Sequence, residues 1–348
     1  MCAIRTYLYN LASGRINGPL AVLIKGILFL FSGIYGLGVV ILVKFKHLRP
    51  QRLKARVISV GNITLGGTGK TTLVEYLANK FSQAGKRVAI LTRGYERDKR
   101  QSGLAGLGDE PAMLQKNLPL VNVIVNRDRL KSAQEALQEY NAQILILDDG
   151  FQQWGIVKDL EIVTIDARAP FGNNLLLPAG FLREPLSALR RADIFVLTQV
   201  QTESQTVSLI ARLLRINKRA LIVSSCHEAQ SFSSLNKPHE VLDLSAFRGR
   251  QAIIFSGIGN PQGFEDLVRS LGVKVTHILR FADHYNYTAQ DLDKIKELAS
   301  LKNTDLFITT QKDAVKISRL DISACRIFAL NIKLKFIKNE EEFNRRLF

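Results

Sequence analysis

The sequence predicts an α/β fold with a doubly wound, mostly parallel sheet, a second, smaller α/β domain and an N-terminal membrane helix. Short runs of β-branched residues alternate with segments whose apolar residues recur at helical spacing, which is typical of parallel strands joined by helices. A glycine-rich loop follows the first strand, and an uncharged apolar segment precedes it. The 348 residues suffice for about two domains at ~150 residues each.

The apolar segment, residues 26–43, is the first predicted element and reads GILFLFSGIYGLGVVILV. As a helix it would be ~27 Å long, close to the ~30 Å hydrocarbon layer of a bilayer. Basic residues flank it, three before and six after, so a spanning helix would place the rest of the chain in the cytoplasm, at the inner membrane. A helix lying in one leaflet, or a buried helix of the globular domain, stays an alternative.

The charge distribution separates two classes of partner. Residues 1–56 contain nine Lys or Arg and no Asp or Glu, so they supply more than half of the net charge of +17. Charge gathered around one apolar segment favours an anionic membrane surface over nucleic acid as the partner. The three cysteines are far apart, which indicates neither a disulfide framework nor a metal cluster. No obligate protein partner is expected.

A phosphate-binding loop is predicted directly after the strand at residues 57–60. The sequence GNITLGGTGKTT (residues 61–72) lies between that strand and a helical pattern that begins at Leu73. In this context backbone N–H groups and the helix N-terminus can bind the polyphosphate of a nucleotide. Thr64 stands where such loops usually have their first glycine. The expected nucleotide-binding residues are Gly66, Gly67, Thr68, Gly69, Lys70, Thr71 and Thr72.

The alternation continues with strands at residues 86–92, 121–125 and 143–147 and a helix at about 128–140. Asp148 and Asp149 follow the strand at 143–147, where ligands of doubly wound sheets collect. With the Thr71 hydroxyl they are the expected ligands of Mg²⁺. Further strands are expected at residues 161–166, 194–199, 220–225, 252–257, 273–278, 305–310 and 326–330.

Seven segments in order resemble the tetraacyldisaccharide 4'-kinases of lipid A biosynthesis. They are GNITLGGTGKTT (61–72), TRGY (92–95), GDEP (108–111), LDDGFQ (147–152), LLPAGFLREP (176–185), FADH (281–284) and TTQKDAVK (309–316). The resemblance implies transfer of the γ-phosphoryl group of ATP to the 4'-hydroxyl of a tetraacylated glucosamine disaccharide 1-phosphate. The product of this transfer would be lipid IVA. The resemblance also implies a membrane-associated segment (1–50), a nucleotide-binding kinase domain (51–225) and a smaller α/β domain that closes the cleft (226–348).

The resemblance also implies roles for single residues. Asp109 would be the proton acceptor, tuned or oriented by His284 from the other domain, and Lys70 would act on the phosphates. Glu110 and Gln152 are expected near the substrate. Arg93 and Arg183 are candidates for phosphate contacts, because guanidinium groups pair bidentately with phosphate oxygens. The chain departs from the family pattern at Glu96, Gln153 and Gln311.

Two other functions compete with a lipid kinase. A membrane-anchored ATPase switch or metal-insertion chaperone would share the loop, but the scattered cysteines offer no ligand set for a metal. A nucleic-acid-binding protein would be expected to bind duplex in a salt-dependent way even without residues 1–56, but the rest of the chain supplies less than half of the net charge. The charge distribution argues against that function.

Overall fold

The computed structural model describes residues 2–47, 49–94, 108–237, 239–302, 304–323 and 325–348. It separates into two compact units, and each is described by itself. Unit 1 contains residues 1–93, 120–226 and 336–348, and unit 2 contains residues 94–119 and 227–335. The chain passes from unit 1 to unit 2 after residue 226, and both units are discontinuous. Residues 94–119 belong with unit 2, and the last residues return to unit 1.

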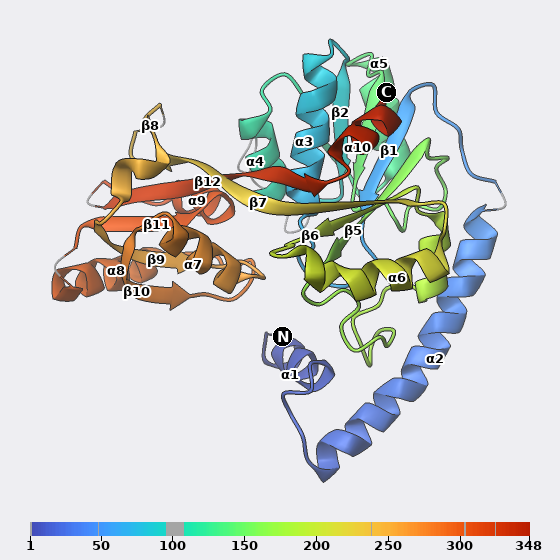
Figure 1. Ribbon diagram of the computed structural model, residues 1–348, viewed down its shortest axis with the longest axis horizontal. Coiled ribbons are helices and arrows are strands. Elements are labelled where there is room, and N and C mark those ends of the chain that lie inside the picture. Colours follow the sequence, from blue (N-terminus) through green and yellow to red (C-terminus); the bar gives the residue numbers. More distant parts are fainter. Residues whose placement is uncertain (1, 48, 95–107, 238, 303, 324) are drawn as a thin grey trace. The chain divides into compact units, whose positions relative to one another are not determined.

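Unit 1 is built on a parallel sheet with the strand order β7-β6-β5-β1-β4-β2-β3 (Figure 1). Continuous apolar runs bury the central strands, as expected for a sheet covered on both faces. The doubly wound α/β prediction is confirmed. The strands are β1 (Arg56–Gly61), β2 (Val88–Thr92), β3 (Asn122–Val125), β4 (Ile144–Asp148), β5 (Leu160–Asp166), β6 (Ile194–Thr198) and β7 (Leu221–Ser234).

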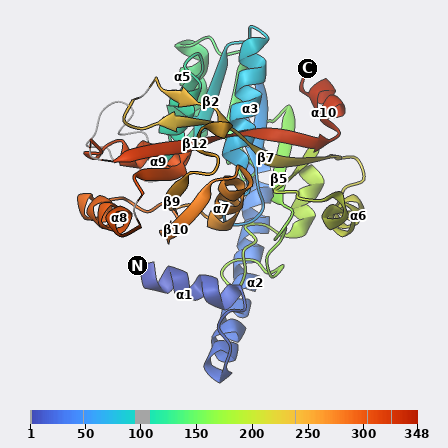
Figure 2. The ribbon, with the colours of Figure 1, turned by 60° about the vertical axis from the view of Figure 1, so that its left-hand side comes forward.

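Two apolar clusters hold the helices of unit 1 to its sheet. One contains Phe171, Phe195 and Leu213, and the other contains Val57, Leu91 and Ala133. The C-terminal helix also belongs to unit 1 (Figure 2). Its Phe343 and Leu347 are fully buried. The helices are α1 (Cys2–Ala12), α2 (Pro19–His47), α3 (Lys70–Gln83), α5 (Arg129–Gln138), α6 (Val207–Ile216) and α10 (Glu340–Leu347).

Helix α2 is longer than the predicted apolar segment and exposes most of its apolar side chains. Within the described residues, Pro19–Lys46 is long and apolar enough to cross a membrane. Leu30 is 71% exposed, whereas Ser32 is buried and contacts a loop of the same unit. The Ser32 hydroxyl donates to the Leu176 carbonyl at 2.9 Å and accepts from the Ala179 N–H at 3.0 Å. One narrow side of α2 is therefore attached to unit 1.

Unit 2 is a smaller α/β unit with the parallel strand order β10-β9-β11-β12. Phe232, Phe247 and Phe328 stack edge to face in its core. Strands β7 and β12 each run from one unit into the other. The remaining elements are β8 (Val241–Leu242), β9 (Gln251–Ser256), β10 (Lys274–Arg280), β11 (Leu306–Thr310), β12 (Arg326–Lys338), α4 (Asp109–Asn117), α7 (Pro261–Ser270), α8 (Ala289–Lys302) and α9 (Gln311–Ile317).

Candidate active site

The glycine-rich loop joins β1 to α3 at the carboxyl end of the central strand. Gly66 (φ +110°) and Gly69 (φ +77°) adopt left-handed backbone that favours glycine. A Cβ on Gly66 or Gly67 would have no neighbouring atom within 4 Å, so this rim of the loop is open. Helix α3 begins at Lys70, directly after Gly69. The loop therefore has the open backbone and the helix N-terminus that a phosphate group requires.

Other residues of the loop are tied to the neighbouring strands. Thr68 is buried; its hydroxyl lies 2.7 Å from that of Thr164, and its carbonyl accepts from the Thr198 hydroxyl at 3.0 Å. Thr72 donates to the Gly69 carbonyl at 2.9 Å. Thr64 forms an antiparallel bridge with Leu182, an extended arrangement that suits a β-branched residue. The departure at Thr64 therefore has a local structural reason.

Asp149 lies between two cations of unit 1. Its carboxylate accepts two hydrogen bonds from Arg183 Nη1, at 2.8 and 2.9 Å, and lies 3.6 Å from Lys70 Nζ. Burial raises the pKa of Asp149, but the charges of Lys70 and Arg183 outweigh it and hold the pKa below its ordinary value of 3.8. The carboxylate is thus ionised beside the lysine of the phosphate loop.

Asp148 ends β4 and is buried. One oxygen of its carboxylate accepts from the Thr92 hydroxyl at 3.1 Å, and its carbonyl accepts from Arg129 at 3.1 Å. Lys70 and both aspartates lie at one edge of the sheet, and Thr71 follows Lys70 in α3. Such oxygen donors suit Mg²⁺, which binds through one or two carboxylates together with substrate phosphates. The described residues contain no group of three or more His, Cys, Asp or Glu placed to hold a metal ion.

Gln152 belongs to a polar network that the sequence prediction missed in part. Its amide donates to Glu184 at 3.0 Å and accepts from Arg183 at 3.3 Å. Glu184 is 1% exposed and pairs with Arg191 at 2.9 Å, and the Arg191 guanidinium lies over the Phe151 ring at 4.4 Å. The segment LLPAGFLREP contains Glu184 directly after Arg183, so the motif itself held the signal.

The remaining predicted residues of unit 1 have fewer contacts in the structure. Arg93 follows β2 and is exposed. Gln153 lies in a turn, where its N–H donates to the Gly150 carbonyl at 2.8 Å. Tyr95, the end of the TRGY segment, and the departure at Glu96 lie outside the described residues. The predicted roles of these residues stay predictions.

Unit 2 contains the second group of predicted residues. Asp109 is the first residue of α4, where the helix N-terminus stabilises a carboxylate. Gly108 precedes it at φ +87°, which explains the glycine of GDEP. Lys316 of α9 lies 3.0 Å from Asp109, and Lys312 lies 3.0 Å from Glu110. Helices α4 and α9 are thereby joined by two ion pairs.

His284 lies in the same unit, which corrects the expectation that it faces Asp109 from the other domain. The reason is that residues 94–119 belong with unit 2, where α4 pairs with α9. His284 has a left-handed backbone (φ +60°), and its Nε2 is 3.3 Å from Lys312 Nζ. Burial lowers the pKa of Lys312, but the charges of Glu110 and Asp283 outweigh it and raise the pKa above its ordinary value. An ammonium group donates, so this contact is a hydrogen bond in the tautomer whose Nε2 carries no proton.

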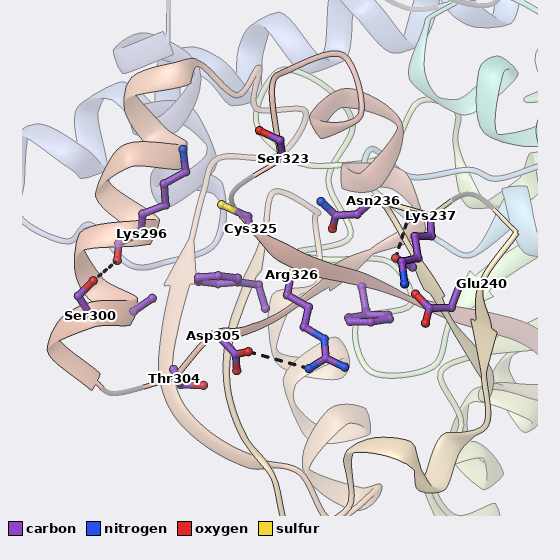
Figure 3. Close-up of a pocket in the computed structure, with 14 residues that line it drawn as sticks. Asn236, Lys237, Glu240, Lys296, Ser300, Thr304, Asp305, Ser323, Cys325 and Arg326 are labelled. Carbon is purple, nitrogen blue, oxygen red and sulfur yellow. Dashed lines mark hydrogen bonds and ion pairs between the residues drawn. The ribbon is translucent and has the colours of Figure 1, made fainter.

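A pocket of unit 2 contains none of the predicted residues. It lies beside the amino ends of β11 and β12, where Asp305 and Arg326 face each other at 3.9 Å (Figure 3). Ligands of parallel sheets bind at the carboxyl ends instead. The pocket is therefore separate from the candidate site.

Comparisons with known proteins identify the family of the chain. The family model for LpxK, tetraacyldisaccharide-1-P 4'-kinase, matches residues 24–348. Tetraacyldisaccharide 4'-kinase from Halothermothrix orenii is 37% identical, with 92% of this chain and 90% of the relative covered. That from Elusimicrobium minutum is 38% identical, with 91% and 89% covered. LpxK from Aquifex aeolicus, solved in complex with ATP, has a TM-score of 0.73 and 31% identity, with 93% and 98% covered. The chain belongs to the tetraacyldisaccharide-1-phosphate 4'-kinase family.

Proposed function

We propose that this chain transfers the γ-phosphoryl group of ATP to the 4'-hydroxyl of a tetraacylated glucosamine disaccharide 1-phosphate, a step of lipid A biosynthesis that forms lipid IVA. The single observation that carries the proposal is the open glycine-rich loop at the N-terminus of α3, with Lys70 next to Asp149, in a member of this family. The solved Aquifex relative, crystallised in complex with ATP, supports the choice of nucleotide.

The residues of unit 1 would bind the nucleotide. The backbone of Gly66–Gly69 donates to the phosphates, and Lys70 exchanges its contact with Asp149 for the β- and γ-phosphate oxygens. Thr71, Asp148 and Asp149 would hold Mg²⁺, which neutralises charge on the phosphates when it is bound. Arg183 keeps Asp149 ionised and oriented, and Arg93 contacts phosphate. Gln152 orients the substrate from the network that contains Glu184.

Unit 2 would supply the proton acceptor. Asp109 accepts the proton of the 4'-hydroxyl, and His284 orients or tunes this carboxylate. Glu110 supports the arrangement through Lys312. Phosphoryl transfer depends mainly on positioning and charge neutralisation, so these roles match what the reaction requires.

We also infer that α2 attaches the chain to an anionic membrane surface, at the cytoplasmic side of the inner membrane. Its exposed apolar side chains and the basic residues around it support this location. An acylated substrate is itself a membrane lipid, so attachment would place the enzyme on its substrate. Neither nucleic acid nor an obligate protein partner has a part in this proposal.

The test is transfer of labelled phosphate from [γ-³²P]ATP to purified tetraacyldisaccharide 1-phosphate in mixed micelles. We expect label in the lipid, and losses of ~100-fold or more in kcat for Lys70→Met and for Asp109→Asn. Lys296→Met, which removes a surface ion pair with Asp293, is the matched control and should keep wild-type activity. Label released only as inorganic phosphate would favour an ATPase instead.

A further inference from the structure

Of the two lysines in the segment TTQKDAVK, Lys312 supports Glu110 in the proposed reaction, whereas Lys316 has no role in it so far. The segment contains the start of α9, whose Lys312 and Lys316 are four residues apart and therefore lie on one face of the helix. Both lysines contact residues that the proposed function assigns to proton acceptance. The contacts of Lys316 are the more buried ones.

Lys316 is buried with two oxygen partners. Only 4% of its side chain is exposed, and Asp109 is 8% exposed. Its Nζ lies 3.0 Å from Asp109 Oδ2 and donates to the Tyr285 carbonyl at 2.9 Å. A buried ammonium group is unfavourable unless it is paired and hydrogen-bonded, and these two oxygens meet that need. Lys316 and Asp109 therefore form a buried, hydrogen-bonded ion pair and not a flexible one at the surface.

The two partners of Lys316 belong to the two segments that carry the proposed proton acceptor and its histidine. Asp109 begins α4, and Tyr285 directly follows His284. One ammonium group therefore joins the carboxylate to the backbone next to the imidazole. The backbone N–H of His284 in turn donates to the Gly257 carbonyl at 3.1 Å, which gives the His284 loop a second attachment.

Hydrogen bonds hold helix α9 in place, so the backbone that carries Lys316 is fixed. The Thr310 hydroxyl accepts from the Asp313 N–H at 3.1 Å and donates to the Asp313 carboxylate at 2.7 Å, which caps the helix. The same carboxylate accepts from the Gly257 N–H at 3.0 Å. Helix α9 and the His284 loop thus share Gly257 as an anchor.

We propose that Lys316 is a positioning residue. It fixes the Asp109 carboxylate and keeps it at a constant position relative to the loop that contains His284. The inference rests on the proposed function and deepens it. A carboxylate that must accept a proton within about 3 Å loses rate steeply when it is displaced, and a shift of about 1 Å costs ~100-fold. Without its ammonium partner, Asp109 would turn away to reach water.

The test is a double-mutant cycle in the labelled transfer assay, with the full chain. We expect Lys316→Met to lower kcat ~100-fold and to leave KM for ATP within about twofold, because the nucleotide loop belongs to unit 1. In the Asp109→Asn background the same substitution should cost less than about threefold, since the group that Lys316 positions is already gone. The control Lys296→Met should cost nothing in either background.

A purely structural role predicts a different result, namely an equal loss of kcat with or without Asp109, and that result would overturn the proposal. If Lys316→Met does not fold, Lys316→Arg decides, because it keeps the charge but changes the geometry. Positioning predicts ~10-fold lower kcat for it at an unchanged urea midpoint; full activity would contradict the proposal. If wild-type protein labels no lipid, the proposed function fails and the inference fails with it. If wild type is active but the kcat losses of Lys316→Met and Asp109→Asn multiply independently in the double variant, only the inference is refuted.

Discussion

Replacing Arg183 with Met tests the charge balance around Asp149 most sharply. The substitution keeps an unbranched side chain but removes both hydrogen bonds to the carboxylate, at 2.8 and 2.9 Å. It also removes the donor to Gln152, at 3.3 Å. Asp149 would then keep Lys70 as its cationic partner, at 3.6 Å.

The expected loss follows from the geometry and the burial. Two unit charges 2.8 Å apart attract by about 6 kcal/mol at an effective dielectric constant of about 20. Desolvation of both groups, several kcal/mol for each ion, offsets much of this attraction. Less than a fifth of either side chain is exposed, so solvent screening is limited. We expect Arg183→Met to lower the free energy of unfolding of unit 1 by about 2–3 kcal/mol at neutral pH, the value of hydrogen bonds to a charged group.

The pH dependence has a definite sign. The folded-state pKa of Asp149 lies below its ordinary value of 3.8, so its contribution is present above that value and is lost as the pH falls through the folded-state pKa. Without Arg183 the pKa moves back toward its ordinary value. The stability difference between wild type and variant should therefore be complete at neutral pH and shrink below about pH 4.

Urea unfolding followed by tryptophan fluorescence measures this difference, because the chain's one tryptophan, Trp154, belongs to unit 1. Arg168→Met is the matched control: Arg168 also pairs bidentately with an aspartate, Asp166, but 35% of its side chain is exposed. Such a pair contributes at most about 1 kcal/mol. An Arg183→Met loss no larger than that of the control, or a loss that persists unchanged in acid, would refute the reasoning.

Three further substitutions test other parts of the structure. Gly61→Ala should lower the free energy of unfolding by about 1–3 kcal/mol, because its Cβ would lie 2.5 Å from Phe151. Gly155→Ala, with open space around it, should be neutral in the same urea titration, and equal effects of the two substitutions would contradict this packing. Asp148→Asn should raise the Mg²⁺ concentration for half-maximal transfer ~10–100-fold; an unchanged Mg²⁺ titration would exclude it as a ligand. Leu30→Asp, at a 71% exposed position of α2, should weaken co-sedimentation with anionic vesicles at unchanged stability, and undiminished binding would remove α2 from the attachment surface.

The sequence predicted the core strands well because local patterns determine them. Buried runs such as the one in β4 have continuous apolar residues, and the phosphate loop has its glycines where the left-handed backbone requires them. The pairing of Lys70 with Asp149 follows from parallel strands that end at one edge. These features depend on residues that are near in sequence or in register.

Features that depend on long-range packing were not predictable in the same way. A strand was expected at residues 220–225, but β7 continues to Ser234 because Phe232 is buried and pairs with β8. Asp109 belongs to unit 2, where it pairs with Lys316, about two hundred positions further along the chain. No local pattern contains such a contact, so the expected division of Asp109 and His284 between domains was wrong.

The central claim is that the chain phosphorylates the 4'-hydroxyl of the acylated disaccharide 1-phosphate. Its most direct test is the position of the new phosphate in the lipid product, determined by ³¹P NMR and fragmentation mass spectrometry after incubation with ATP and Mg²⁺. We expect a bisphosphorylated lipid whose new phosphate is on the 4'-oxygen, formed by wild type and lost in Asp109→Asn. Lipid that remains monophosphorylated while ATP is consumed, or phosphate at another oxygen, would contradict it.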